Sequence, residues 1–192
     1  MQHVLPKTGV YLVDAMLGFM MSKAKEKLIQ FDVKITDTLN SLINNVLTQG
    51  KLETLTADLL ENAIISMVKS EYRRIFVSVS KQDCIFEISV SDSGIPFEID
   101  TLYKLGREKS STHTKTGGQG IGFMTLFEIL QEVSASLIIS EPRPIPHEMT
   151  KSVAIRFDGK ADYIVRSYRA DEIKAQGAQY DMSRLTNVMP IC

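Results

Sequence analysis

The sequence has no excess of charge of either sign, few cysteines and no long apolar run. Its 22 basic and 23 acidic residues leave a net charge of −1, so we expect no nucleic-acid partner, and any anion site must be local. The two cysteines, Cys84 and Cys192, are far apart, which argues against a disulfide framework or a cysteine-ligated zinc site. The best membrane candidate, residues 10–22, carries Asp14 and is shorter than the ~20 residues of a spanning helix. We therefore expect the sequence as given to be soluble.

Length and composition predict a globular unit with a real core. The chain has 192 residues, of which 44% are hydrophobic and 23% are charged, as in ordinary folded proteins. We assign residues 1–175 to one domain, in which residues 1–50 form a helix–strand–helix part. Residues 176–192 are weakly patterned and are assigned to a C-terminal tail.

Hydrophobic periodicity predicts an α+β fold, with helices on one face of a mixed sheet. Helices are expected at 10–29, 38–47, 100–106 and 121–133, and another from Thr54 or Thr56 to Met67. Strands are expected at 31–35, 74–80, 84–91, 136–140, 151–157 and 163–168. Residues 74–91 read as an antiparallel hairpin around Lys81-Gln82-Asp83, and the last two strands as a closing pair around Asp158-Gly159.

Five of the 11 glycines lie between Gly106 and Gly122, and this cluster runs directly into a predicted helix. Closely spaced glycines and a helix N-terminus present backbone N–H groups to an anion such as phosphate. A Rossmann loop would follow a strand, which is missing here, and no Gly-Lys-Ser/Thr follows for a Walker loop. A glycine-rich hinge is the alternative reading.

Asp92 lies in the segment Val90-Ser91-Asp92-Ser93-Gly94. Period-two geometry puts it on the apolar face that carries Phe86, Ile88 and Val90, where a carboxylate needs a donor. Gly94 leaves space beside it, so a flat base with an exocyclic amine would fit. The alternative is an aspartate that caps its own turn.

Asp58 and Asn62 are four residues apart on a predicted helix and therefore share a face. The asparagine oxygen beside a carboxylate suits a hard cation such as Mg²⁺. Glu61 points elsewhere and is expected in solvent. An ordinary polar helix face is the alternative reading.

Together and in this order, the three segments resemble the GHKL ATPase superfamily of histidine kinases, DNA gyrase, Hsp90 chaperones and MutL proteins. Residues 58–63 match its asparagine box, Asp92-Ser93-Gly94 its first glycine box, and residues 118–122 its second. The resemblance implies a Bergerat-type two-layer α+β sandwich with a mixed, mostly antiparallel sheet. Within the superfamily, the lid at residues 110–115 and the Leu-Leu-Glu-Asn-Ala-Ile stretch resemble the catalytic domains of sensor histidine kinases, above all the peptide-pheromone-sensing kinases and their Firmicute relatives.

The resemblance implies ATP and Mg²⁺ as cofactors and assigns roles to five residues of the first two boxes and the last sheet strands. Asp92 would accept a hydrogen bond from the adenine amine, with Gly94 beneath the ring and Thr150 near the base. Asn62 would bind the Mg²⁺ that bridges the phosphates. Asp58 would be the catalytic carboxylate that orients the nucleophile.

The second glycine box and the lid would hold the triphosphate. Backbone amides of Gly118, Gly120 and Gly122, with Ile121 between them, would surround the phosphates, and Lys115 lies in the lid that would close over them. Two departures stand out, because Pro96 replaces a glycine of the first box and no lysine closely follows Asn62. Phosphate charge would then be met by one of several basic residues: Lys69, Arg73, Arg107, Lys109 or Lys115.

The function that the resemblance implies is transfer of the ATP γ-phosphoryl group to a histidine outside this sequence, in two-component signalling. The histidines present, His3, His113 and His147, are not on a long amphipathic helix, so the acceptor is expected on a dimerisation segment of the full-length protein. A response regulator would be an indirect partner. We expect a cytoplasmic domain of a membrane-anchored protein. The alternatives are a GHKL-type ATP hydrolase and a non-catalytic, nucleotide-gated interaction module.

Overall fold

The computed structural model describes residues 6–67, 70–105, 122–177 and 187–189. Six helices and seven strands lie in these ranges. The helices are α1 (Tyr11–Glu26), α2 (Asn40–Asn45), α3 (Gln49–Ser66), α4 (Ile99–Lys104), α5 (Gly122–Glu132) and α6 (Ala170–Gly177). The strands are β1 (Gln30–Ile35), β2 (Arg74–Gln82), β3 (Ile85–Asp92), β4 (Ser136–Glu141), β5 (Lys151–Phe157), β6 (Tyr163–Ser167) and β7 (Asn187–Met189).

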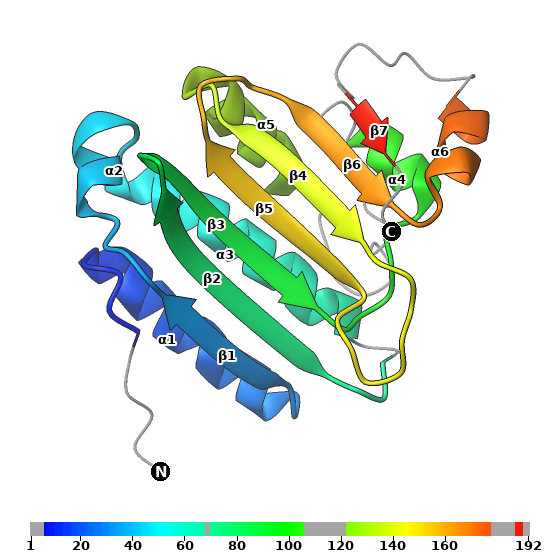
Figure 1. Ribbon diagram of the computed structural model, residues 1–192. Helices are drawn as coiled ribbons and strands as arrows, with labels where there is room; N and C mark the ends of the chain where they lie inside the picture. The colour runs from blue at the N-terminus through cyan, green and yellow to red at the C-terminus, as the bar shows by residue number, and fades with distance from the viewer. Residues whose placement is uncertain (1–5, 68–69, 106–121, 178–186, 190–192) are drawn as a thin grey trace.

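The strands form one mixed sheet in the order β1-β2-β3-β5-β4-β6-β7. The central pairs β2–β3, β3–β5 and β4–β5 are antiparallel, whereas β1–β2, β4–β6 and β6–β7 are parallel. Figure 1 shows α1, α3 and α5 behind this sheet, so the helices form a second layer. The predicted α+β class with a mixed sheet is confirmed, but antiparallel pairing dominates only in the centre.

The core lies between the two layers and follows the predicted periodicities. Alternate residues of β2 and β3 are buried, and the buried residues of α1 recur at helical spacing. Leu17 of α1 and Leu60 of α3 have no exposed surface. Burying each such leucine is worth about 1.5–3 kcal/mol relative to exposing it, so this interface fixes α3 against the sheet.

Two predicted boundaries are wrong. Helix α3 begins at Gln49 rather than at Thr54 or Thr56, because the Thr48 side chain accepts a hydrogen bond from the Lys51 amide and caps the helix. The hairpin between β2 and β3 turns at Asp83 and Cys84, whose φ angles of 48° and 66° are typical of a type I′ turn. Cys84 is therefore exposed and does not belong to a strand.

The predicted closing pair of strands is also wrong, because β4 lies between β5 and β6. The connection from β5 to β6 crosses the start of β4, where the Ser136 hydroxyl donates to Asp158 (2.8 Å) and accepts from the Asp162 amide (3.1 Å).

Part of the segment that was assigned to a tail belongs to the sheet, because Asn187–Met189 forms edge strand β7, which pairs with β6. Among the described residues, no helix has the length and apolar character needed to cross a membrane.

Candidate functional site

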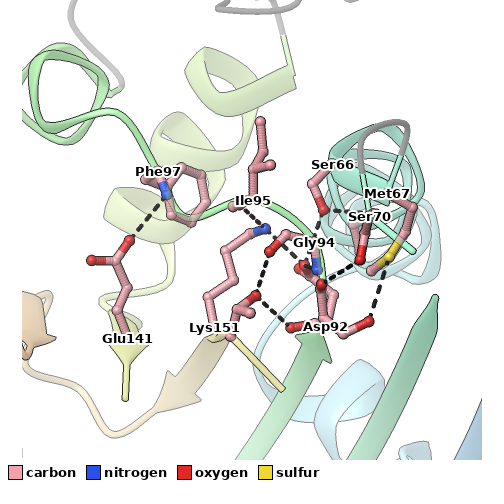
Figure 2. Close-up of polar contacts among 12 residues, drawn as sticks. Ser66, Met67, Ser70, Asp92, Gly94, Ile95, Phe97, Glu141 and Lys151 are labelled. Atoms are coloured by element: carbon pink, nitrogen blue, oxygen red, sulfur yellow. Dashed lines mark hydrogen bonds and ion pairs between the residues drawn. The ribbon is translucent and has the colours of Figure 1, made fainter. Parts of the chain in front are cut away.

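Helix α3 carries three polar residues in one line. Asp58, Asn62 and Ser66 are spaced four residues apart, so each lies about 6 Å further along the same face of the helix. Ser66, at the C-terminal end, reaches Asp92 at the end of β3, as Figure 2 shows. The line therefore leads from the end of β3 toward Asn62 and then Asp58.

Asp92 is a buried carboxylate with donors gathered on one oxygen. Its side chain is 3% exposed, and Oδ1 accepts hydrogen bonds from the Gly94 amide (2.9 Å), the Lys151 ammonium (2.7 Å) and the Ser66 hydroxyl (3.0 Å). The single Ser66 proton is shared with the Ala63 carbonyl. Among the described residues, no donor reaches Oδ2. The second oxygen is thus available to an incoming donor.

Burial and charge act on Asp92 in opposite directions. Burial raises the pKa of the Asp92 carboxyl, and the Lys151 ammonium works against that rise, together with bonds from Gly94 and Ser66. Sequence reasoning missed Lys151. It begins β5 directly opposite Asp92, on the face that also carries Val153 and Ile155, so a lysine that interrupts this apolar alternation was the available signal.

Gly94 must be glycine because helix α3 approaches its backbone. A Cβ atom at this position would lie 2.1 Å from the Ser66 Oγ and 2.8 Å from the Ser66 carbonyl carbon. Open space for a flat ligand was expected beside Gly94, but the Cβ side of Gly94 is filled by Ser66. This packing holds Asp92 and the end of α3 together.

Thr150 lies beside Asp92 and Gly94, and its expected place near the base stays a prediction. Its hydroxyl donates to the Gly94 carbonyl (2.5 Å) and lies 3.1 Å from the Asp92 carbonyl, which also accepts from the Thr150 amide. In this arrangement Thr150 binds the backbone of the first glycine box.

Asn62 and Asp58 are half-buried neighbours on α3. The Asn62 side-chain nitrogen donates to the Asp58 carbonyl (2.8 Å), which leaves the amide oxygen on the other side of that group. The Asp58 Oδ2 atom is buried and has no hydrogen-bond partner among the described residues. Burial, and secondarily the charge of Glu61, raises the pKa of Asp58 to about 6. Glu61 is exposed and pairs with Lys23 of α1 (2.8 Å), as expected for a solvated side chain.

A second buried carboxylate, also missed from sequence, holds the segment that follows Gly94. Glu141 at the end of β4 has no exposed surface, and it accepts from the Phe97 amide (3.0 Å), the Ser167 hydroxyl (2.8 Å) and the Arg169 guanidinium (2.8 Å). Lys151 binds the same segment at the Ile95 carbonyl (2.6 Å), as seen in Figure 2.

The remaining candidates are only partly described. Gly122 is the first residue of α5. Four other candidates lie outside the described residues, so their expected roles stay predictions: Lys115, Gly118, Gly120 and Ile121.

Of the candidate phosphate-binding residues, Arg73 is described, and its guanidinium donates to the carbonyls of Ser70 and Lys27. His147, in the connection between β4 and β5, packs edge-on against the ring of Tyr72.

The arrangement can bind a flat donor at Asp92 and a hard cation at Asn62. In the described part of the chain, no cluster of three or more His, Cys, Asp or Glu side chains could hold a metal by itself. The amide oxygen of Asn62 does fit Mg²⁺, which commonly takes one or two protein oxygens and completes its shell with water and phosphate.

Solved structures of histidine kinases have a similar fold. The nucleotide-free catalytic domain of histidine kinase ThkA aligns with a TM-score of 0.60 at 17% identity, covering 76% of this chain and 89% of that one. The mycobacterial sensor histidine kinase MprB aligns with a TM-score of 0.58 at 14% identity, covering 76% of this chain and 91% of that one. These likenesses establish the fold.

Sequence comparison places the same region in a family. The histidine protein kinase SaeS of Staphylococcus epidermidis is 28% identical over 103 residues, which cover 52% of this chain and 29% of SaeS. A probable C4-dicarboxylate sensor kinase of Bacillus subtilis is 30% identical over 129 residues, 65% of this chain and 24% of that protein. The chain thus spans less than a third of either relative's length. A profile of one family matches residues 48–161, which hold both the asparagine box and the first glycine box. The chain belongs to that family, the histidine kinase-, DNA gyrase B- and HSP90-like ATPases.

Proposed function

We propose that this chain is the ATP-binding catalytic domain of a sensor histidine kinase, and that it transfers the γ-phosphoryl group of ATP to a histidine on a dimerisation segment of the same protein. The observation that carries the proposal is Asp92, whose Oδ1 is saturated by protein donors while Oδ2 is left for a ligand. The names of the two curated relatives support the kinase reading over other members of the family.

Asp92 would select adenine by its exocyclic amine. The carboxylate of a buried side chain is stabilised by each hydrogen bond that it accepts, and an N–H group of the base would donate one to Oδ2. Guanine presents an acceptor at the corresponding position, which Oδ2 would repel. Thr150 and Ser66 keep the backbone and side chain of Asp92 in place for this contact.

The line of residues on α3 would then receive the phosphates. Asn62 lies about 6 Å from Ser66 along the helix, and Asp58 about 6 Å further. We propose that the Asn62 oxygen binds Mg²⁺ and that Asp58 orients the nucleophile as a positioned base. When bound, Mg²⁺ would neutralise charge on the phosphates during transfer.

The expected remainder of the site belongs to this proposal as well. Lys115 and the box formed by Gly118, Gly120, Ile121 and Gly122 would complete the phosphate contacts, within a nucleotide-binding unit of residues 1–175. A response regulator would receive the phosphoryl group afterwards, and the domain would work in the cytoplasm as part of a membrane-anchored protein.

ATP hydrolysis is the second candidate, and Asp58 is the observation that favours it. A half-buried carboxylate with a free oxygen and a pKa of about 6 can orient an attacking water molecule as readily as the imidazole of an acceptor histidine. Hydrolysis by the isolated chain, in the absence of any acceptor histidine, would separate the two functions.

The substitution Asp92→Asn tests the adenine contact. We expect it to weaken ATP binding by about 1–3 kcal/mol, because a charge-assisted hydrogen bond in a buried site is lost. The amide oxygen of the variant side chain is also expected to keep the Gly94 and Ser66 donors, so that its NH₂ group faces the base and the preference for ATP over GTP shrinks or reverses. Titration calorimetry with ATP and GTP measures both effects.

A matched control for this change is Asp83→Asn. Asp83 is exposed in the turn at the opposite end of β3, where its positive φ suits asparagine. The control should bind ATP like the wild type. Equal affinity of the wild type for ATP and GTP would contradict the role of Asp92.

The substitution Asn62→Ala tests the metal contact. We expect ATP affinity to lose its dependence on Mg²⁺ while adenosine binding stays nearly unchanged, because only the phosphates reach the metal. Calorimetry with ATP and adenosine, with and without Mg²⁺, gives the comparison.

Asn45→Ala is the control for Asn62→Ala. Asn45 on α2 donates to the carbonyl of Ser41 four residues earlier, so it loses the same kind of helix contact without approaching the site. If Asn62→Ala weakens adenosine and ATP equally, Asn62 has a structural role and the metal assignment fails.

A further inference from the structure

Lys151 is a buried charge on an otherwise apolar face of the sheet. On β5 it shares that face with Val153 and Ile155, and its side chain is 4% exposed. An apolar residue at such a position is usually at least as favourable for stability as one half of a buried ion pair. The lysine is therefore explained better by what it does to Asp92 than by packing.

The position of the ammonium is fixed by two acceptors, one at the end of β3 and one just beyond it. Its nitrogen lies 2.7 Å from the Asp92 Oδ1 and 2.6 Å from the Ile95 carbonyl oxygen, and 5.5 Å from the centre of the Phe97 ring. Asp92 and Lys151 are also paired residues of β3 and β5, so their backbones set the distance between the two side chains. The ammonium holds Oδ1 on the protein side and leaves Oδ2 turned away from it.

Without a nearby cation, Asp92 would not serve as an acceptor. Among the described residues, Lys151 is the charged group in contact with Asp92, and the other groups on Oδ1 are a hydroxyl and an amide. A carboxyl this deeply buried then takes up a proton instead of holding an uncompensated charge. A protonated carboxyl cannot offer both oxygens to N–H donors.

We propose that Lys151 is a positioning residue for the nucleotide base: its ammonium keeps Asp92 in the carboxylate form and presents Oδ2 to the adenine amine. This inference rests on the proposed function, since it concerns the same site. It makes the Asp92–Lys151 pair, and not Asp92 alone, the element that recognises the base.

The test compares adenosine binding by the wild type, Lys151→Met and Lys151→Arg between about pH 6 and pH 9. Adenosine has no phosphates, so Asn62 and the second glycine box do not enter. We expect flat profiles for the wild type and Lys151→Arg. For Lys151→Met we expect affinity lower by about 10- to 100-fold near pH 6, recovering as the pH rises and Asp92 ionises. Lys160→Met, which removes an exposed lysine just beyond β5, is the control and should match the wild type.

The possible results separate this inference from the function on which it rests. A wild type that binds neither ATP nor adenosine overturns the proposed function and the inference with it. A wild type that binds adenosine, with Lys151→Met equal to it or weakened to the same extent at every pH, overturns the inference alone. Weaker ATP binding with unchanged adenosine binding would also overturn it, because Lys151 would then act on the phosphates.

A measurement on the wild type covers the case in which Lys151→Met does not fold. The carboxyl carbon signal of Asp92, assigned by its loss in Asp92→Asn, reports the protonation state directly by NMR. A signal that stays in the carboxylate position from about pH 6 to pH 9 supports the inference. Titration of this signal within that range overturns it.

Discussion

Asp58→Asn is expected to slow phosphoryl transfer by about 10²- to 10⁴-fold, the usual contribution of a positioned general base, while ATP affinity changes by no more than about threefold. Asp58 lies one helical turn before Asn62, and its Oδ2 is buried without a partner in the described part of the chain. That oxygen is free to accept the proton of an attacking group. The amide of the variant keeps the shape of the side chain but cannot accept that proton.

The measurement uses the chain mixed with the dimerisation segment that carries the acceptor histidine. Formation of an acid-labile, base-stable phosphohistidine reports transfer, and calorimetry reports ATP binding. The isolated chain should turn ATP over well below the typical enzyme rate of about 10 s⁻¹. Steady hydrolysis by the isolated chain that is lost in Asp58→Asn would instead support the hydrolase function.

Glu61→Gln is the matched control for this substitution. Glu61 is a carboxylate on the same turn of α3, but it is exposed and paired with Lys23. The control should transfer the phosphoryl group at the wild-type rate. A comparable loss in both variants would mean that negative charge on α3 matters in general, and that Asp58 has no specific role.

The physical basis of the Asp58 prediction has its own readout in the absence of metal and nucleotide. Burial raises the pKa of Asp58 from 3.8 in the unfolded chain to about 6 in the folded one. The ionised carboxylate therefore destabilises the fold increasingly above about pH 4, and fully above about pH 6. The shift corresponds to about 3 kcal/mol in full, and solvent at this half-buried group reduces it to about 1–2 kcal/mol. Denaturation should show Asp58→Asn gaining stability over the wild type from about pH 4 to pH 7, with the difference vanishing at lower pH. A pH-independent difference would contradict desolvation as the cause.

Local patterns in the sequence sufficed for much of the fold, but they could not give the strand order, which distant contacts decide. The alternation in β2 and β3 and the helical spacing in α1 and α5 predicted those elements close to their observed bounds. The order β5-β4-β6 could not be predicted, since it depends on which strands pair across the sheet; Ser136 bonds both ends of the connection that crosses β4. The late start predicted for α3 was a local error, because the Thr48 cap begins the helix six to eight residues before the predicted threonines.

The candidate site likewise combines residues that local sequence motifs predicted with partners that they did not. Asp58, Asn62, Asp92 and Gly94 lie within short motifs, and the structure brings them along one face of α3 and the adjoining end of β3. Their partners come from other strands. Lys151 interrupts an apolar alternation that is visible in the sequence, but only the register of β5 against β3 reveals that it faces Asp92.

Glu141 and Arg169 form the other buried pair, and breaking it gives the largest expected loss of stability. We expect Arg169→Met to lower the free energy of unfolding by about 3–5 kcal/mol, because it removes the cation that compensates the fully buried Glu141 carboxylate. The guanidinium also donates to the Phe97 carbonyl (2.7 Å), so the variant loses a bond to the segment after the first glycine box. Chemical denaturation and the melting temperature, expected to fall by about 10 °C, measure the effect.

Arg156→Met is the matched control, since Arg156 makes the same kind of pair with Glu87 in a half-exposed position. Breaking that pair should lower the free energy of unfolding by less than about 1 kcal/mol. The double variant Glu141→Gln/Arg169→Met should recover part of the loss, because glutamine accepts from Phe97 and pairs with Ser167 without a charge. If the double variant is no more stable than Arg169→Met alone, the loss comes from the missing arginine contacts and packing, and the buried charge of Glu141 is not its cause.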